Sequence, residues 1–179
     1  ISETQHEVDI VSEQQGLTPP AYLNELGLLT PKNFNAHCVW LNEADQELFA
    51  SKGAHVVHCP SSNLKLGSGI APISAYLKKG INVALGTDGC ASNNNLDMVE
   101  EMRLAALLQK GVNHDPTLLP AREALKMATL NGAKALGLDH IIGSLETGKR
   151  ADLLIIDTDN TFMQPIYDYY SAIVYSMNS

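Results

Sequence analysis

The sequence has few of the features that mark secreted, membrane-spanning or nucleic-acid-binding proteins. It has three cysteines in 179 residues, an odd number with no Cys-x-x-Cys pair. This favours a reducing compartment over a disulfide framework. No apolar run reaches the ~18 residues of a membrane span, and no secretory leader is recognisable. We therefore expect a cytoplasmic protein with no membrane partner.

Basic residues are also scarce. The chain has 12 Lys and Arg against 20 Asp and Glu, a formal net charge of -8, and no basic cluster. This excludes nucleic acid from the expected partners. Hydrophobic residues make up 45% and charged residues 18%, so a folded core is expected. The chain opens on "ISETQHE" and closes on "YDYYSAIVYSMNS", which reads as part of a longer protein.

Short apolar segments alternate with helical patterns through the middle of the chain. The apolar segments span residues 33–41, 54–60 and 81–87, and the helices expected after them span residues 42–53, 73–80 and 96–111. Polar stretches at 61–72 and 90–95 read as loops, with Asn95 as the cap of the last helix. This alternation predicts βαβ units and a parallel sheet, with sites at the carboxyl ends of the strands. It fits a barrel and an open sheet equally.

The flanks of the chain differ from this middle part. Helices are expected at residues 3–15 and 18–29, and a helix over 119–138 with a break at Asn131-Gly132. After it, strands are expected at residues 153–156 and 171–176. We predict a first domain over residues 1–138 and a second, smaller one over residues 139–179.

Three ionisable residues, His37, His58 and Asp88, lie at corresponding ends of the expected strands. His55 lies three residues before His58, so the two point to opposite faces of a regular strand. A hydrogen-bonded structural histidine remains an alternative for His58, and a simple turn remains one for "GTDG" around Asp88. His6 and Glu7 read as part of a solvated helix face.

A resemblance sharpens these alternatives. The ordered strings "SET", "NAHCVWLNEAD", "HVVHCPSSNLKLGSGIAP" and "NVALGTDGCASNNNLDMVEEMRLAALLQK" resemble the amidohydrolase superfamily. Within it they are similar to the branch of 5-methylthioadenosine/S-adenosylhomocysteine deaminases and triazine hydrolases. "ATLNGAKALGL" and "GSLETGKRADLLIID" extend the similarity over essentially the whole chain. The resemblance implies an α/β fold: the last strands and helices of a (β/α)8 TIM-like barrel, with the start of a C-terminal β-sandwich segment.

The resemblance also implies a metal-dependent active site. Carried over by position, Glu3, His37 and Asp88 would be catalytic, and Asp88 would bind one divalent metal, zinc first and iron as the alternative. The family's other histidine ligands have no counterpart in this sequence. Glu3, Asp88, His58 and Asn63 would contact substrate. Ser61, Asn63 and Lys65 would be polar contacts to substrate. The alternative interpretation is that they belong to a loop whose shape is set by the backbone needs of Gly67 and Gly69.

The implied reaction of the complete enzyme is hydrolytic deamination of a purine-like ring, such as 5-methylthioadenosine or S-adenosylhomocysteine. Its partners would be a small heterocyclic amine and water, and the enzyme would form a homo-oligomer. Guanine deamination and triazine hydrolysis are the alternatives within the superfamily. An alternative outside the enzymes is an inactive truncated fragment that serves only as a folded or interacting module.

Overall fold

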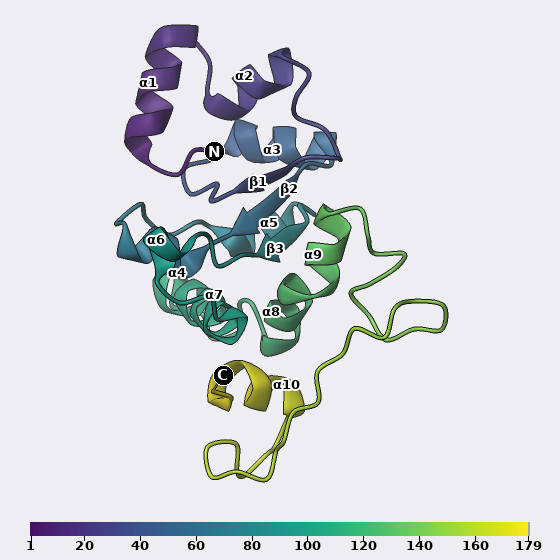
Figure 1. Cartoon of the computed structure of the whole chain (residues 1–179). Coiled ribbons are helices and arrows are strands. Elements are labelled where there is room, and N and C mark those ends of the chain that lie inside the picture. Colours follow the sequence, from purple (N-terminus) through teal and green to yellow (C-terminus); the bar gives the residue numbers. More distant parts are fainter. Residues whose placement is uncertain (179) are drawn as a thin grey trace.

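A computed structural model describes residues 1–178 and contains a three-stranded parallel sheet (Figure 1). Its strands are β1 (Phe34–Ala36), β2 (His55–His58) and β3 (Val83–Leu85), in the spatial order β1-β2-β3. Asn35 pairs with Val56, and Val57 pairs with Ala84. The predicted βαβ succession is confirmed, although each strand is shorter than the apolar segment that predicted it.

The N-terminal helices and the first crossover helix form as the capping signals predict. They are α1 (Gln5–Gln15), α2 (Pro19–Glu25) and α3 (Glu43–Lys52). Thr4 and Thr18 accept backbone hydrogen bonds at the starts of α1 and α2. Asn42 and Asp45 form a capping box on α3. α3 carries the chain from β1 to β2 across one face of the sheet.

Both polar stretches expected to be loops contain a helix instead. α4 (Pro60–Lys65) follows β2 directly, and α6 (Cys90–Asn93) follows β3. Proline at the first position of α4 fixes a helical φ and lacks an N–H that would have no partner there. α5 (Ile73–Lys78) completes the second crossover.

The long helix α7 (Met98–Asn113) begins later than predicted. Asp97 caps it by accepting from the N–H groups of Val99 and Glu100, so the assignment of Asn95 as cap is wrong. The following helical region divides into α8 (Ala121–Ala128) and α9 (Leu130–Ala135). The break falls at Thr129 rather than at Asn131-Gly132. Asn131 stays helical, and its side chain donates to the Val83 carbonyl of β3 at 2.9 Å.

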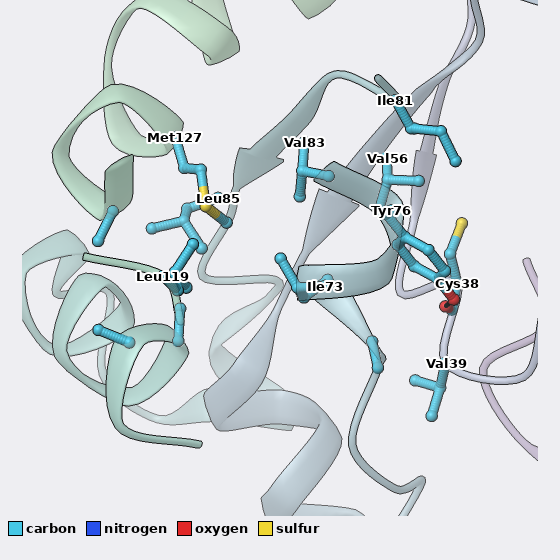
Figure 2. Close-up of a cluster of buried hydrophobic side chains, with 14 of the residues drawn as sticks. Cys38, Val39, Val56, Ile73, Tyr76, Ile81, Val83, Leu85, Leu119 and Met127 are labelled. Atoms are coloured by element: carbon cyan, nitrogen blue, oxygen red, sulfur yellow. Dashed lines mark hydrogen bonds between the residues drawn. The ribbon is translucent and has the colours of Figure 1, made fainter. Parts of the chain in front are cut away.

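The core lies between the sheet and the helices that cover it (Figure 2). Val56 and Val83 from the strands pack with Tyr76 of α5 and Met127 of α8, and all four are fully buried. The Tyr76 hydroxyl donates to the Cys38 carbonyl at 2.6 Å, so this large buried ring has a partner for its polar atom. The core thereby anchors the turn that follows β1.

The C-terminal region differs from its predicted strands. Residues 153–156 pair with no strand of the described chain, and Leu154 and Ile155 are 88% and 92% exposed. Residues 171–176 are helical: α10 (Tyr169–Ser171) continues into the π-helix η1 (Ala172–Ser176) against α7 and α8 (Figure 1). A strand needs a partner edge, whereas a helix satisfies its own backbone and buries Val174. The division into domains at residue 138 remains a prediction.

Within residues 1–178, no helix is both long enough and apolar enough to cross a bilayer.

Candidate active site

The residues singled out from the sequence converge at the carboxyl edge of the parallel sheet. His37 follows β1, Asn63 lies on the helix that follows β2, and Asp88 follows β3. The N-terminal segment brings Glu3 to the same place, because the carbonyl of Ser2 accepts from the N–H groups of Val39 and Trp40. This edge is where α/β barrels place their active sites.

His37 has a neighbouring polar group at each ring nitrogen. Its backbone has a left-handed φ of 69°, and its N–H donates to the Val57 carbonyl at 2.9 Å. Nδ1 lies 2.9 Å from Oδ1 of Asn63, and Nε2 lies 3.7 Å from Oε2 of Glu3. The ring therefore stands between an amide on one side and a carboxylate on the other.

Glu3 is fixed at both its backbone and its side chain. The Ser68 hydroxyl donates to Glu3 Oε1 at 2.9 Å, and the Glu3 N–H donates to the Glu7 carboxylate at 2.8 Å. Glu7 also accepts from the Ser2 N–H at 2.9 Å. The sequence spacing suggested that Glu7 belongs to a solvated helix face. Instead, its carboxylate holds the segment that carries Glu3.

Asp88 is an exposed carboxylate that accepts hydrogen bonds from two serines. Ser62 and Ser92 donate to the same oxygen, Oδ2, at 2.7 and 2.6 Å. The hydrogen bonds from Ser92 and Ser62 hold the pKa of Asp88 below its usual value, with help from the Gly89 backbone and the nearby His37. Asp88 is therefore ionised at neutral pH, with one oxygen fixed by the protein.

A buried carboxylate supports the loop that carries Asp88. Glu101 of α7 accepts from the Ser61 N–H at 3.1 Å and from the Asn93 side chain at 2.8 Å. Asn93 also donates to the Thr87 carbonyl at 2.7 Å. Burial raises the pKa of Glu101, against the effect of these hydrogen bonds. Glu101 thus ties α4, α6 and the end of β3 together.

Sequence reasoning missed four of these residues: Ser62, Ser68, Ser92 and Glu101. A local signal existed for Ser92, which stands four residues after Asp88, the distance of one helical turn. Ser62 follows a strand end and a helix-starting proline, which place its hydroxyl near the sheet edge. Nothing in the local sequence marks Ser68 or Glu101, because their partners are distant along the chain.

Two of the predicted substrate contacts are deeply buried. His58 is 1% exposed, and neither ring nitrogen has a hydrogen-bond partner within the described residues. Burial, followed by the nearby His37, lowers the pKa of His58 to about 3. Asn63 is equally buried and bonded to His37. Lys65 donates to the Ala91 carbonyl at 3.1 Å. Their roles toward substrate remain predictions.

The described residues do not form a metal site by themselves. No group of three or more His, Cys, Asp or Glu side chains within residues 1–178 is arranged to hold a metal ion. A catalytic zinc normally takes three protein ligands. Asp88 fits as one of them, because it is ionised and exposed and its Oδ2 is held in place. The described residues alone do not complete the set.

Comparison with known proteins identifies the family of this fold and site. The amidohydrolase family matches residues 1–179, and the chain belongs to that family. It is 52% identical over 176 residues to the 5-methylthioadenosine/S-adenosylhomocysteine deaminase of Moorella thermoacetica, covering 98% of this chain. The chain spans 41% of that relative's length. The family resemblance noted from the sequence is confirmed.

Solved structures agree on the fold. An adenosine deaminase from Xanthomonas campestris with bound zinc is similar at a TM-score of 0.95 and 46% identity, over 98% of this chain and 40% of its own. Atrazine chlorohydrolase from Arthrobacter aurescens, complexed with zinc, is similar at a TM-score of 0.92 and 30% identity, over 98% and 39%. The chain is thus α/β and forms part of an amidohydrolase barrel.

Proposed function

We propose that the full-length protein carrying this chain is a metal-dependent hydrolase that deaminates a purine-like ring, such as 5-methylthioadenosine or S-adenosylhomocysteine. One observation carries the proposal: Glu3, His37 and Asp88, far apart in sequence, meet at the carboxyl edge of a barrel sheet. The high identity to a deaminase of these substrates supports the choice of substrate class.

We further propose that Asp88 is one ligand of a divalent metal, zinc in preference to iron. The remaining ligands would come from the part of the relatives' length that this chain does not span. A bound metal would lower the pKa of a coordinated water to roughly 7 and so supply hydroxide at neutral pH. The zinc in both similar structures supports this assignment.

The residues of this chain would move the protons. Ser62 and Ser92 hold Oδ2 of Asp88, which leaves Oδ1 to accept the proton of the attacking water. Glu3 would take the other proton of this water and pass it to the ring nitrogen beside the attacked carbon, while His37 orients the water through Nε2. The proton on Asp88 would then pass to the departing amine. The balance is ring amine plus water giving ring carbonyl plus ammonia.

Ammonia release by the full-length protein tests this proposal. We expect turnover of 5-methylthioadenosine or S-adenosylhomocysteine above adenosine, guanine and melamine. Asp88→Asn should lower kcat by at least about 10² to 10⁴-fold, the usual contribution of one acid–base group. An Asp88→Asn protein that keeps both its metal and its turnover would show that Asp88 has neither role.

Alternatives follow from the same site. A triazine-type hydrolase is favoured by the likeness to atrazine chlorohydrolase, and guanine deamination is the other candidate. Both alternative activities would use the same acid–base residues. Either one would be recognised by a different preferred substrate in the ammonia-release assay. A fragment serving only as a folded or interacting module would show a mass near 19.3 kDa and no bound metal. Size-exclusion chromatography and fractionation would test the proposed homo-oligomer and cytoplasmic location.

A further inference from the structure

Asn63 is more firmly placed than a residue that only contacts substrate needs to be. Its side chain is 1% exposed, and its Oδ1 lies 2.9 Å from Nδ1 of His37. Its backbone N–H donates to the Cys59 carbonyl at 3.0 Å, and its carbonyl accepts from the Ser68 N–H at 2.8 Å. The backbone of Asn63 is therefore fixed on α4, and its Oδ1 faces one nitrogen of the histidine ring, while its Nδ2 is buried without a partner among the described residues.

We infer that Asn63 is a positioning residue that sets the proton arrangement of His37. Because an amide oxygen can only accept, the Oδ1 that faces the ring places the hydrogen of neutral His37 on Nδ1. In the neutral ring the lone pair then lies at Nε2, on the side of Glu3. The 3.7 Å between Nε2 and Glu3 Oε2 is too long for a hydrogen bond and leaves Nε2 available.

This arrangement decides what His37 can do. With hydrogen on Nδ1, the neutral ring accepts a hydrogen bond at Nε2, and the protonated ring donates one there. Both forms keep the bond to Oδ1 of Asn63, whereas the neutral form with hydrogen only on Nε2 would bond Asn63 only if the amide turned to present Nδ2. Asn63 therefore makes Nε2 the working nitrogen. The catalytic consequence rests on the proposed deaminase function, but the proton arrangement is a property of the chain itself.

Nitrogen-15 NMR of the histidine rings tests the arrangement directly. His55 provides an internal reference, because its Nε2 lies 3.2 Å from the Pro31 carbonyl and must carry the hydrogen there. At a pH where both rings are neutral, we expect His37 to show hydrogen on Nδ1 and His55 to show it on Nε2. His37 with hydrogen on Nε2 in the native protein would overturn the inference.

Two variants separate positioning from packing. Asn63→Asp keeps an acceptor in the same place and should preserve the Nδ1–H form of His37. Asn63→Leu removes the acceptor at similar size and should shift His37 toward the Nε2–H form, while His55 stays unchanged. If His37 keeps its Nδ1–H form in Asn63→Leu, the amide does not set it. Should Asn63→Leu fail to fold, Asn63→Ala removes the same acceptor and takes its place in the comparison.

Kinetics of the full-length protein test the consequence separately. Asn63→Leu should lower kcat by about 10- to 100-fold, the range seen when the hydrogen-bond partner of a metal-binding imidazole is removed, with a much smaller change in KM. Asn63→Asp should recover most of the rate. A raised KM with unchanged kcat would instead make Asn63 a substrate contact and overturn the positioning role. Absence of any deaminase activity in the native protein would refute the proposed function, while the NMR result would stand by itself.

Discussion

The buried, unpartnered His58 predicts a specific sensitivity to acid. Burial lowers its pKa from an ordinary value of about 6.5 to about 3 in the folded protein. In the unfolded chain the same ring takes up a proton as the pH falls below 6.5. The unfolded state therefore binds more protons through this range, and stability is lost as the pH drops from about 6.5 toward 3.

The size of this loss follows from the two pKa values. Between pH 7 and pH 5, His58 alone should lower the free energy of unfolding by about 2 kcal/mol. This is a large share of the ~5–15 kcal/mol available to a typical domain. His55 contributes in the same direction, since burial also lowers its pKa. The carboxylates also change the free energy of unfolding with pH. A matched pair of proteins is needed to isolate His58.

Urea unfolding at pH 7, 6 and 5 provides the assay, followed by the fluorescence of Trp40, the single tryptophan. His58→Leu removes the titrating group and the two unpartnered nitrogens, so we expect little loss of stability at pH 7. Its decline between pH 7 and 5 should be smaller than that of the native protein by about 2 kcal/mol. His58→Gln, which cannot titrate, should behave like His58→Leu. Equal declines in all three proteins would refute the assignment of His58 as a neutral buried ring.

Other parts of the structure make further predictions. Ser92→Ala and Ser62→Ala should each raise the pKa of Asp88, since each removes a hydrogen bond to its charged form, and carboxyl-detected NMR titration checks this. Met127→Ala should destabilise the fold by about 2–5 kcal/mol in urea unfolding, because the side chain is fully buried in the core. Gly86→Ala should cost about 1–3 kcal/mol in the same assay, because a Cβ there would meet Val57 Cγ1 at 2.9 Å.

The sequence predicted the parts of this molecule that depend on local signals. Asn42, Gly53 and Thr18 mark helix ends through side chains and backbone preferences that act within a few residues, and all three act as predicted. The parallel pairing of the strands follows from their alternation with helices. The prediction failed where the partner was distant: residues 153–156 are apolar enough for a strand, yet they pair with no strand of the described chain.

The site shows the same division. Its position at the strand ends was predictable, and the family resemblance named Glu3, His37 and Asp88. The resemblance and the strand pattern did not indicate that Asn63 would turn toward His37 rather than toward a ligand, because that depends on how α4 folds over the strand ends. The serine pair on Asp88 likewise depends on two helices, α4 and α6, that were expected to be loops.

Several site residues have backbone conformations that the surrounding fold must stabilise. Ser2, His37, Cys38 and Asp88 all have left-handed φ values, between 50° and 69°, although none is glycine. Each such residue costs of order 1 kcal/mol or more and persists only where surrounding contacts enforce it. At His37, the backbone N–H donates to the carbonyl of Val57 in β2. At Cys38, the carbonyl accepts from the hydroxyl of Tyr76, which is buried in the core. The sheet and the core therefore stabilise the turn at His37 and Cys38, which the chain would otherwise avoid.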